Sequence, residues 1–128
     1  MHIAQTKIEE LKSLLYAPRS IVILSHTNPD GDAIGSSLAW AELLKKQGHN
    51  VTVCHVANGN MGHVVIMPDE LREIRLGEAR AAAAIGGFSV VTTDFGDLTV
   101  NGASVEQQLA VTKVIRDAKP DLIITHDP

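Results

Sequence analysis

The sequence predicts an α/β fold, a Rossmann-like three-layer αβα sandwich built on a four-stranded parallel sheet. Two observations carry this prediction. Four short apolar runs alternate with three segments of helical composition and period, and a further helical segment precedes the first run. No repeat of solenoid length and no low-complexity tract interrupts this pattern. The order is typical of a doubly wound sheet with right-handed crossovers.

The elements follow from local signals. Apolar residues of the first segment fall on one helical face, so we expect an amphipathic helix packed on the sheet. Pro18 ends it, Gly48 ends the next helix, and Pro120 follows the last one. The loop at 57–63 holds two glycines and is expected to be flexible. The expected helices span residues 2–16, 33–47, 68–85 and 104–118, and the expected strands span 21–25, 51–56, 88–93 and 121–126.

Composition sets the class of protein. A chain of 128 residues, 45% hydrophobic and 20% charged, suits one soluble globular domain over residues 1–128. Aromatic residues make up 3%, so the core must be aliphatic. The net charge of −4 and the lack of a basic run give no strong nucleic-acid signal, and no apolar stretch could span a membrane. Cys54 lies in an apolar run as a buried thiol, and no signal peptide precedes it, so we expect a cytoplasmic protein.

The polar turn after the first apolar run concentrates the chemistry. His26, Asp30 and Asp32 lie where a parallel strand ends, which is the usual place for a ligand in an open α/β sheet. An imidazole and two carboxylates suit Mn²⁺, Zn²⁺ or Fe²⁺. The simpler alternative is that Asp32 or Ser36 only caps the following helix. The cluster of three ligands beside two glycines favours a metal site.

The turn also carries a family resemblance. His-Thr-Asn-Pro-Asp-Gly-Asp-Ala-Ile-Gly-Ser-Ser-Leu-Ala, which begins at His26, resembles the first motif of the DHH phosphoesterases, the superfamily of RecJ-like nucleases and oligoribonucleases. His26, Asp30 and Asp32 match that motif's metal ligands. The resemblance covers residues 1–45 and then fades. It implies phosphoester chemistry at a divalent metal.

Residues 46–128 resemble a different family, the LmbE or PIG-L type zinc deacetylases. Five blocks match in the family's order, and they cover residues 47–53, 58–63, 68–79, 94–97 and 124–128. That family opens with a His-Pro-Asp-Asp type turn and has a later His-Pro-Asp-His type segment. This sequence has the DHH-type turn instead and stops before the later segment, and it also lacks the Asp-His-His motif. We therefore interpret the chain as a hybrid, joined near residues 45–52 and made deliberately, with a natural fusion as the alternative.

The resemblance also gives the strand order. Because strands two to four come from the deacetylase-like part, we expect the order 3-2-1-4 rather than 2-1-3-4. His126 then follows strand four beside strand one and could share a metal with His26. Its alternative, a plain polar strand end, stays open. Asp94 lies two strand spacings, roughly 9–10 Å, from strand one and is left out of the site.

Other polar residues are given structural roles. Ordinary helix-surface pairing with Glu73 and Glu78 explains Arg72 and Arg75. Neither His55 nor His63 is assigned as a ligand, and His2 and His49 are expected on the surface.

The sequence thus predicts a partial divalent-metal site, Mn²⁺ or Zn²⁺ on His26, Asp30, Asp32 and His126, in a scaffold without efficient catalysis and without an assigned catalytic residue. The alternative is a metal-dependent hydrolase, a phosphoesterase or an N-acetyl deacetylase, with Asp30 or Asp32 as the available base. Strand four would leave Leu122, Ile123 and Ile124 as an apolar edge. We therefore expect a homodimer through that edge.

Overall fold

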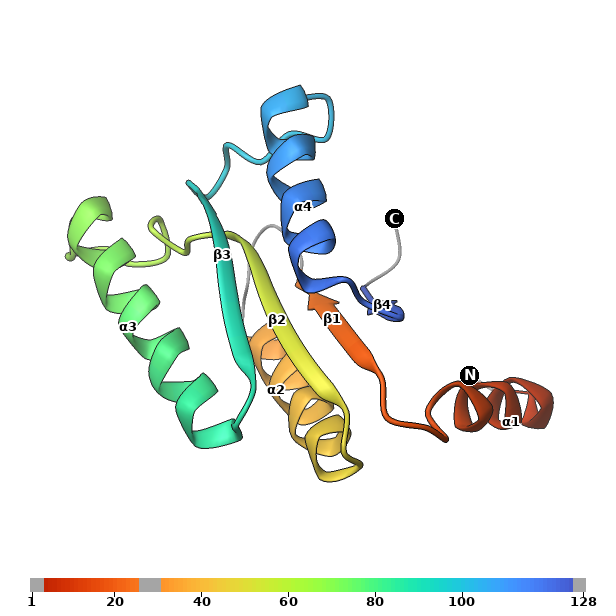
Figure 1. Ribbon diagram of the computed structural model, residues 1–128. Coiled ribbons are helices and arrows are strands. Elements are labelled where there is room, and N and C mark those ends of the chain that lie inside the picture. Colours follow the sequence, from red (N-terminus) through yellow and green to blue (C-terminus); the bar gives the residue numbers. More distant parts are fainter. Residues whose placement is uncertain (1–3, 26–30, 126–128) are drawn as a thin grey trace.

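The structure, a computed structural model, describes the backbone of residues 4–25 and 31–125, and the side chains of the same residues except 31–33. Helices and strands alternate along the chain after a leading helix (Figure 1). The elements are α1 (Gln5–Leu14), β1 (Ser20–Leu24), α2 (Gly31–Lys46), β2 (Asn50–Ala57), α3 (Pro68–Gly86), β3 (Ser89–Phe95), α4 (Val105–Ala118) and β4 (Leu122–Ile124).

The four strands form one parallel sheet in the order β3-β2-β1-β4, which confirms the predicted fold and strand order. Ile23 of β1 lies between Val53 of β2 and Ile124 of β4. This central strand is apolar at every position after its first residue because both of its faces are covered. Ile21 and Val22 are accordingly fully buried.

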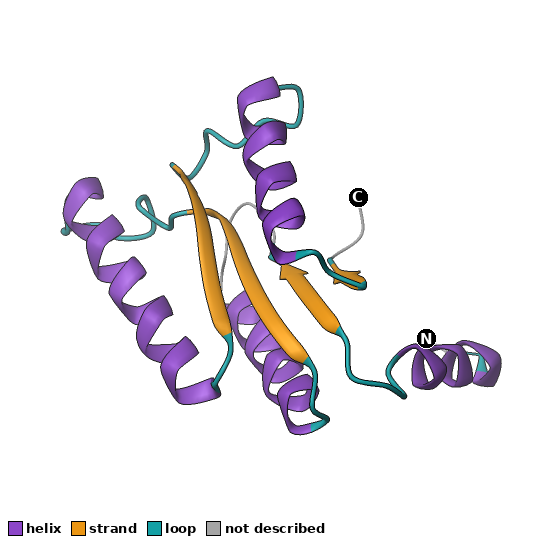
Figure 2. Cartoon of the chain, viewed as in Figure 1, coloured by secondary structure: helices purple, strands orange, loops and turns teal. Residues whose placement is uncertain are grey.

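Helices cover both faces of the sheet (Figure 2). The chain steps from β1 to β2 to β3 in one direction, so right-handed crossovers place α2 and α3 on the same face, where they contact each other. The step from β3 back to β4 runs the opposite way and places α4 on the other face. The core lies under α2, where Ala41 and Leu44 pack against the apolar side chains of β1 and β2.

Local chemistry explains the helix ends. Pro68 and two acidic residues, Asp69 and Glu70, occupy the first turn of α3, and Gly87 ends this helix with a φ of 67°. Ser104 caps α4, because its side-chain oxygen accepts a hydrogen bond from the backbone N–H of Gln107 at 3.4 Å. No helix within the described residues is long and apolar enough to cross a bilayer.

Two expectations, about the N-terminal helix and about His49, are wrong. The leading helix does not pack on the sheet, because α1 lies beside it and buries none of its residues (Figure 1). His49 is not a surface residue, since only 1% of it is exposed. Its Nδ1 accepts a hydrogen bond from the backbone N–H of Arg19 at 3.1 Å. This bond links the segments that directly precede β1 and β2.

Candidate functional site

The predicted metal ligands follow the carboxyl ends of β1 and β4. Of these residues, His26, Asp30 and His126 lie outside the described residues, and Asp32 belongs to α2 without a described side chain. The described backbone ends of β1 and β4 do meet at one edge, because these strands pair through Ile23 and Ile124. No group of three or more His, Cys, Asp or Glu side chains suited to a metal lies within residues 4–25 and 34–125.

A bulge in β3 releases Asp94 from the sheet at the same edge. His55 of β2 pairs with Thr92, but Ala57 pairs with Phe95, so β3 has one extra residue between these positions. Asp94 accordingly adopts a φ of 62°, and its N–H donates to Thr92 Oγ1 at 2.9 Å instead of joining the ladder. Aspartate tolerates this left-handed conformation better than most residues do. The bulge leaves the Asp94 carboxylate available to other groups.

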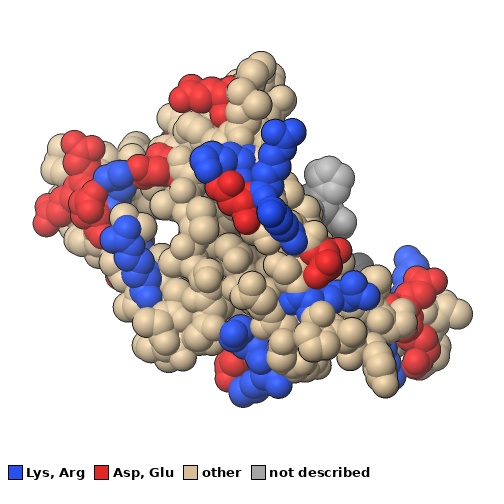
Figure 3. Space-filling model, viewed as in Figure 1, with Lys and Arg blue, Asp and Glu red and all other residues tan. Residues whose placement is uncertain are grey.

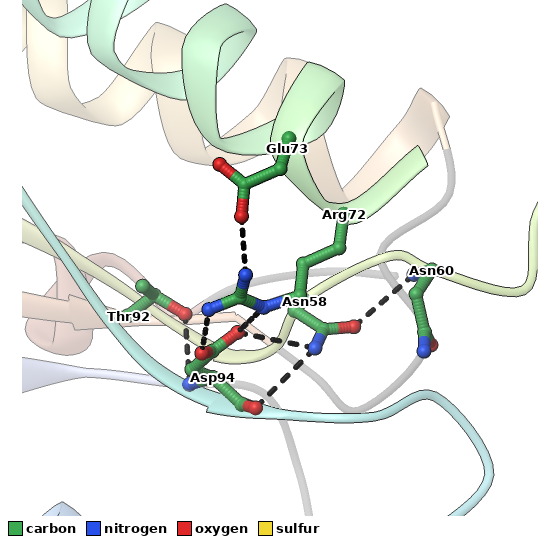
Figure 4. A network of polar contacts seen from close by, with 6 residues as sticks. All are labelled: Asn58, Asn60, Arg72, Glu73, Thr92 and Asp94. Carbon is green, nitrogen blue, oxygen red and sulfur yellow. Dashed lines mark hydrogen bonds and ion pairs between the residues drawn. The ribbon is translucent and has the colours of Figure 1, made fainter. Parts of the chain in front are cut away.

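Asp94 lies at the centre of a polar network that α3 completes (Figure 4). Arg72 donates from Nε to Asp94 Oδ1 at 2.6 Å and from Nη2 to Oδ2, which is the paired geometry that guanidinium and carboxylate favour. Asn58 Nδ2 adds a hydrogen bond to Asp94 Oδ1 at 3.1 Å, and Arg72 Nη1 contacts Glu73. The hydrogen bond from Arg72 is the main cause that lowers the pKa of Asp94, and partial burial opposes it. Asp94 is therefore an anion at neutral pH.

Asp97 joins the loops that follow β2 and β3. Its Oδ1 accepts from the N–H of Gly59 at 3.0 Å, and its Oδ2 accepts from the N–H of Met61 at 3.1 Å. In return, the Asp97 N–H donates to Asn60 Oδ1 at 3.0 Å. Because the side chain is buried and bonded on both oxygens, the loop at 57–63 is fastened to its neighbour.

Ser25 and His55 form a second polar pair at the ends of β1 and β2. Ser25 Oγ lies 3.2 Å from His55 Nδ1, and Ser25 is buried. Burial lowers the pKa of His55, so its imidazole is neutral at pH 7. Ser25 directly precedes His26 in the sequence.

A cleft of about 750 Å³ extends from this edge between α2, α3 and the β2–β3 half of the sheet, and we name it the α3 cleft. Figure 3 shows the molecule hollowed beside α3. Asn58, Arg72 and Asp94 lie at its polar end, and His55 lines its wall. Leu38, Leu76, Phe88 and Val90 supply much of its apolar lining.

Sequence reasoning assigned some of these side chains correctly. Arg75 pairs with Glu78 at 2.8 Å, and Cys54 is fully buried, as predicted. Arg72 does contact Glu73, but its paired hydrogen bonds go to Asp94, and no local pattern places Asp94 opposite α3. The predicted adjacency of β2 and β3 was the available signal, because it puts Asn58 and Asp94 at one sheet edge.

Solved structures share this fold. The N,N′-diacetylchitobiose deacetylase from Pyrococcus horikoshii, solved with its inhibitor MPG, matches 96% of the chain with a TM-score of 0.68 and 21% identity. The 4-carboxy-2-hydroxymuconate hydratase GalB from Pseudomonas putida KT2440 matches 88% with a TM-score of 0.69 and 24% identity. The chain spans 49% of each of these proteins. At such identities the likeness shows the fold alone.

One curated protein and one family model match the sequence of this chain. A probable manganese-dependent inorganic pyrophosphatase from Streptococcus mutans is 28% identical over 95 residues, which are 74% of this chain and 30% of that protein. The family model of PIG-L, described as GlcNAc-PI de-N-acetylase, matches residues 21–128. This match begins at β1, ahead of the junction proposed near residues 45–52, and runs through all four strands. Since it covers most of the sequence, the chain belongs to the PIG-L family.

Proposed function

We propose that the chain carries the divalent-metal site of a hydrolase that acts on the amide of an N-acylated amino sugar. The observation that carries the proposal is the Arg72–Asp94–Asn58 network at the edge of the sheet where the His26–Asp32 turn follows β1. Membership of the PIG-L family supports this reaction class. The network supplies what a sugar requires, because carboxylate and guanidinium groups together accept from and donate to neighbouring hydroxyls.

His26, Asp30, Asp32 and His126 are the residues that we propose to hold the metal. Imidazole nitrogens and carboxylate oxygens are a donor set that fits Zn²⁺ or Mn²⁺, and the pairing of β1 with β4 brings the strand ends that precede them to one edge. When bound, the divalent ion would supply a water molecule of lowered pKa and would polarise the amide carbonyl. Asp30 or Asp32 would take the proton of the attacking water.

Asp94 and Arg72 would position the sugar rather than take part in proton transfer. The Asp94 side chain is 38% exposed, so its carboxylate oxygens can accept hydrogen bonds from hydroxyl groups while Arg72 holds them in place. The lowered pKa of Asp94 keeps it an acceptor throughout the neutral range. Asn58, which directly follows β2, completes the set and helps to orient the carboxylate.

A second candidate is a hybrid scaffold that holds the metal without efficient catalysis. The DHH-type turn at 26–37 favours it, because this turn stands where PIG-L proteins have a different one. The likeness to a manganese-dependent pyrophosphatase is in keeping with such a turn. In this reading the chain combines two families, and neither phosphoester nor amide hydrolysis proceeds beyond a trace rate.

Metal content and turnover separate the candidates. Purified protein would be measured for bound Zn and Mn by mass spectrometry, beside His26→Ala as the metal-site variant. Release of free amine from N-acetylglucosamine and cleavage of a nitrophenyl phosphodiester would then be followed with each metal. Metal-dependent deacetylation that His26→Ala abolishes supports the hydrolase, whereas stoichiometric metal without turnover supports the scaffold. The absence of bound metal in the wild-type protein contradicts both.

Asp94→Asn tests the sugar contact separately. The amide cannot accept both hydrogen bonds from Arg72, so we expect KM for N-acetylglucosamine to rise at least about tenfold while metal content stays unchanged. Glu10→Gln on α1 is the matched control, because Glu10 is exposed and far from the site. An unchanged KM in Asp94→Asn would remove Asp94 from the substrate site.

A further inference from the structure

The α3 cleft exists because α3 does not seal against the sheet along its length. Leu71 and Ala83 are the buried residues of this 19-residue helix, and they lie near its two ends. Between them the side chains that line the cleft include Leu76, Ala79 and Ala82. Alanine is too small to fill the layer between a helix and a sheet, so a hollow remains where a larger residue would complete the packing.

The hollow has the size and lining of a ligand site. Its volume of about 750 Å³ falls within the usual range for small-molecule pockets. Leu38 of α2 and Val90 of β3 contribute apolar walls, and Phe88 lines it at the start of β3. The lining thus extends along β3 from Phe88 to Asp94, a length of roughly 20 Å at ~3.3 Å per residue.

Charge is confined to the exposed side and the polar end of the cleft. Arg75, Glu78 and Arg80 are exposed, and Arg75 pairs with Glu78. Arg72 and Asp94 pair at the carboxyl edge of the sheet. The sheet wall itself contributes no charge, because the pKa of His55 is lowered by burial and its Nδ1 faces Ser25. The interior therefore suits an uncharged, apolar group.

We propose that the α3 cleft binds the acyl chain of an N-acylated sugar, with a chain longer than acetyl. This proposal rests on the function proposed above, and it names the acyl group that the site selects. Ile34 near the start of α2 lines the cleft, and its polar end holds Arg72 and Asp94. If the sugar binds at the Arg72–Asp94–Asn58 network and its amide binds at the metal, the acyl chain would lie in the α3 cleft between α2 and α3.

Calorimetric titration with three probes tests the proposal on the wild-type chain. The probes are N-octanoylglucosamine, N-acetylglucosamine and octanoate, each below its aggregation concentration. Burial of the six further methylene groups should make the octanoyl sugar bind at least about tenfold more tightly than the acetyl sugar. Octanoate should bind more weakly than the octanoyl sugar, because it lacks the sugar contacts. Equal affinity for the octanoyl and acetyl sugars would overturn the proposal.

Two leucine substitutions on α3 localise the binding. Ala79→Leu fills the cleft, and Ala84→Leu adds the same side chain at an exposed position that does not line it. We expect Ala79→Leu to lose the preference for the octanoyl sugar, with binding of the acetyl sugar and the circular dichroism spectrum unchanged, and Ala84→Leu to retain the preference. If Ala79→Leu does not fold, Ala82→Leu tests the same wall. Retention of the octanoyl preference in a folded, cleft-filled variant would contradict the proposal.

Hydrolysis distinguishes the failure of this proposal from that of the proposed function. Tight binding of the octanoyl sugar without any metal-dependent release of amine supports the cleft and contradicts the hydrolase. Metal-dependent deacetylation with no gain from the longer chain supports the hydrolase and contradicts the cleft.

Discussion

Asp97 is the most buried of the described carboxylates. It is 7% exposed, and its two oxygens each accept a backbone N–H from the loop after β2. Without the Asp97 carboxylate, these two backbone N–H groups would lose the acceptor that satisfies them. A single side chain therefore sets the conformation of the loop that borders the α3 cleft.

Asp97→Asn should destabilise the protein by about 1–3 kcal/mol. The amide replaces one acceptor oxygen by an NH₂ group, which then faces the donor N–H of Gly59 or Met61. Urea unfolding measures the loss, and Glu10→Gln provides the control because the Glu10 side chain is exposed. Equal stability of the two variants would mean that the loop does not depend on the carboxylate.

His55 makes stability depend on pH. Its folded pKa lies below the ordinary value because burial disfavours the charged ring. The unfolded chain therefore takes up this proton first as the pH falls through about 6.5. Stability that is present above that pH is lost on acidification, until the folded pKa is reached.

The expected slope from this one group is at most about 1.4 kcal/mol per pH unit below pH 6.5. Urea unfolding at pH 7.5, 6.5 and 5.5 would reveal it. His55→Gln should remove this part of the slope, whereas an identical slope in wild type and variant would assign it to other histidines.

At the scale of single elements, Gly77 inside α3 and Gly87, which caps this helix, have opposite roles. Gly77 lies in the exposed middle of the helix, where an added Cβ meets nothing within 4 Å. Gly87 ends the helix in the left-handed region, where a side chain is strained whatever the space. The same substitution should consequently have opposite signs at the two positions.

Gly77→Ala should stabilise the protein by about 0.5–1 kcal/mol, because alanine loses less backbone entropy on entering a helix. Gly87→Ala should destabilise it by about 1 kcal/mol through the left-handed conformation. Thermal unfolding of both variants checks the pair, and each serves as the control for the other. Shifts of the same sign would show that the helix end can rearrange.

Elements were more predictable than the contacts between them. Helix and strand periods placed all eight elements, and α4 begins one residue after the predicted start because Ser104 is its cap. Two other features depend on distant partners. His49 is buried with its Nδ1 bonded to the N–H of Arg19, thirty residues earlier, and the residues around Gly48 do not predict this contact. The bulge that frees Asp94 arises from the register between β2 and β3, and a local pattern does not encode it.

The whole molecule exposes more surface than its mass accounts for. A folded monomer of 13.7 kDa has about 6,600 Å² of accessible surface, whereas this chain has 8491 Å². The separate position of α1 and the open side of the α3 cleft contribute to the excess. The excess is larger than the roughly 800 Å² that each partner buries in a standard interface.

We propose that a second copy covers part of this surface at the β4 edge, where Ile123 is 40% exposed. Light scattering at high micromolar concentration should give twice the 13.7 kDa of one chain. Ile123→Lys should convert the dimer into a monomer, since charge on an edge strand opposes pairing between strands. Ile85→Lys, at a 90% exposed position on α3, is the control and should remain a dimer. A monomeric wild type would contradict the proposal.

The central place of β1 has a consequence for synthesis on the ribosome. One neighbour of β1, the strand β2, is synthesised soon after it, but the other neighbour, β4, is synthesised last. The N–H of Ser20 donates to Asp121, which lies 101 residues later in the chain. At about 5–20 residues per second, that edge stays unpaired for on the order of ten seconds. During this interval the nascent chain presents an apolar strand with free backbone groups, which is a binding site for chaperones. A slower ribosome would lengthen the exposure, so the yield of folded protein should depend on the speed of translation between β2 and β4.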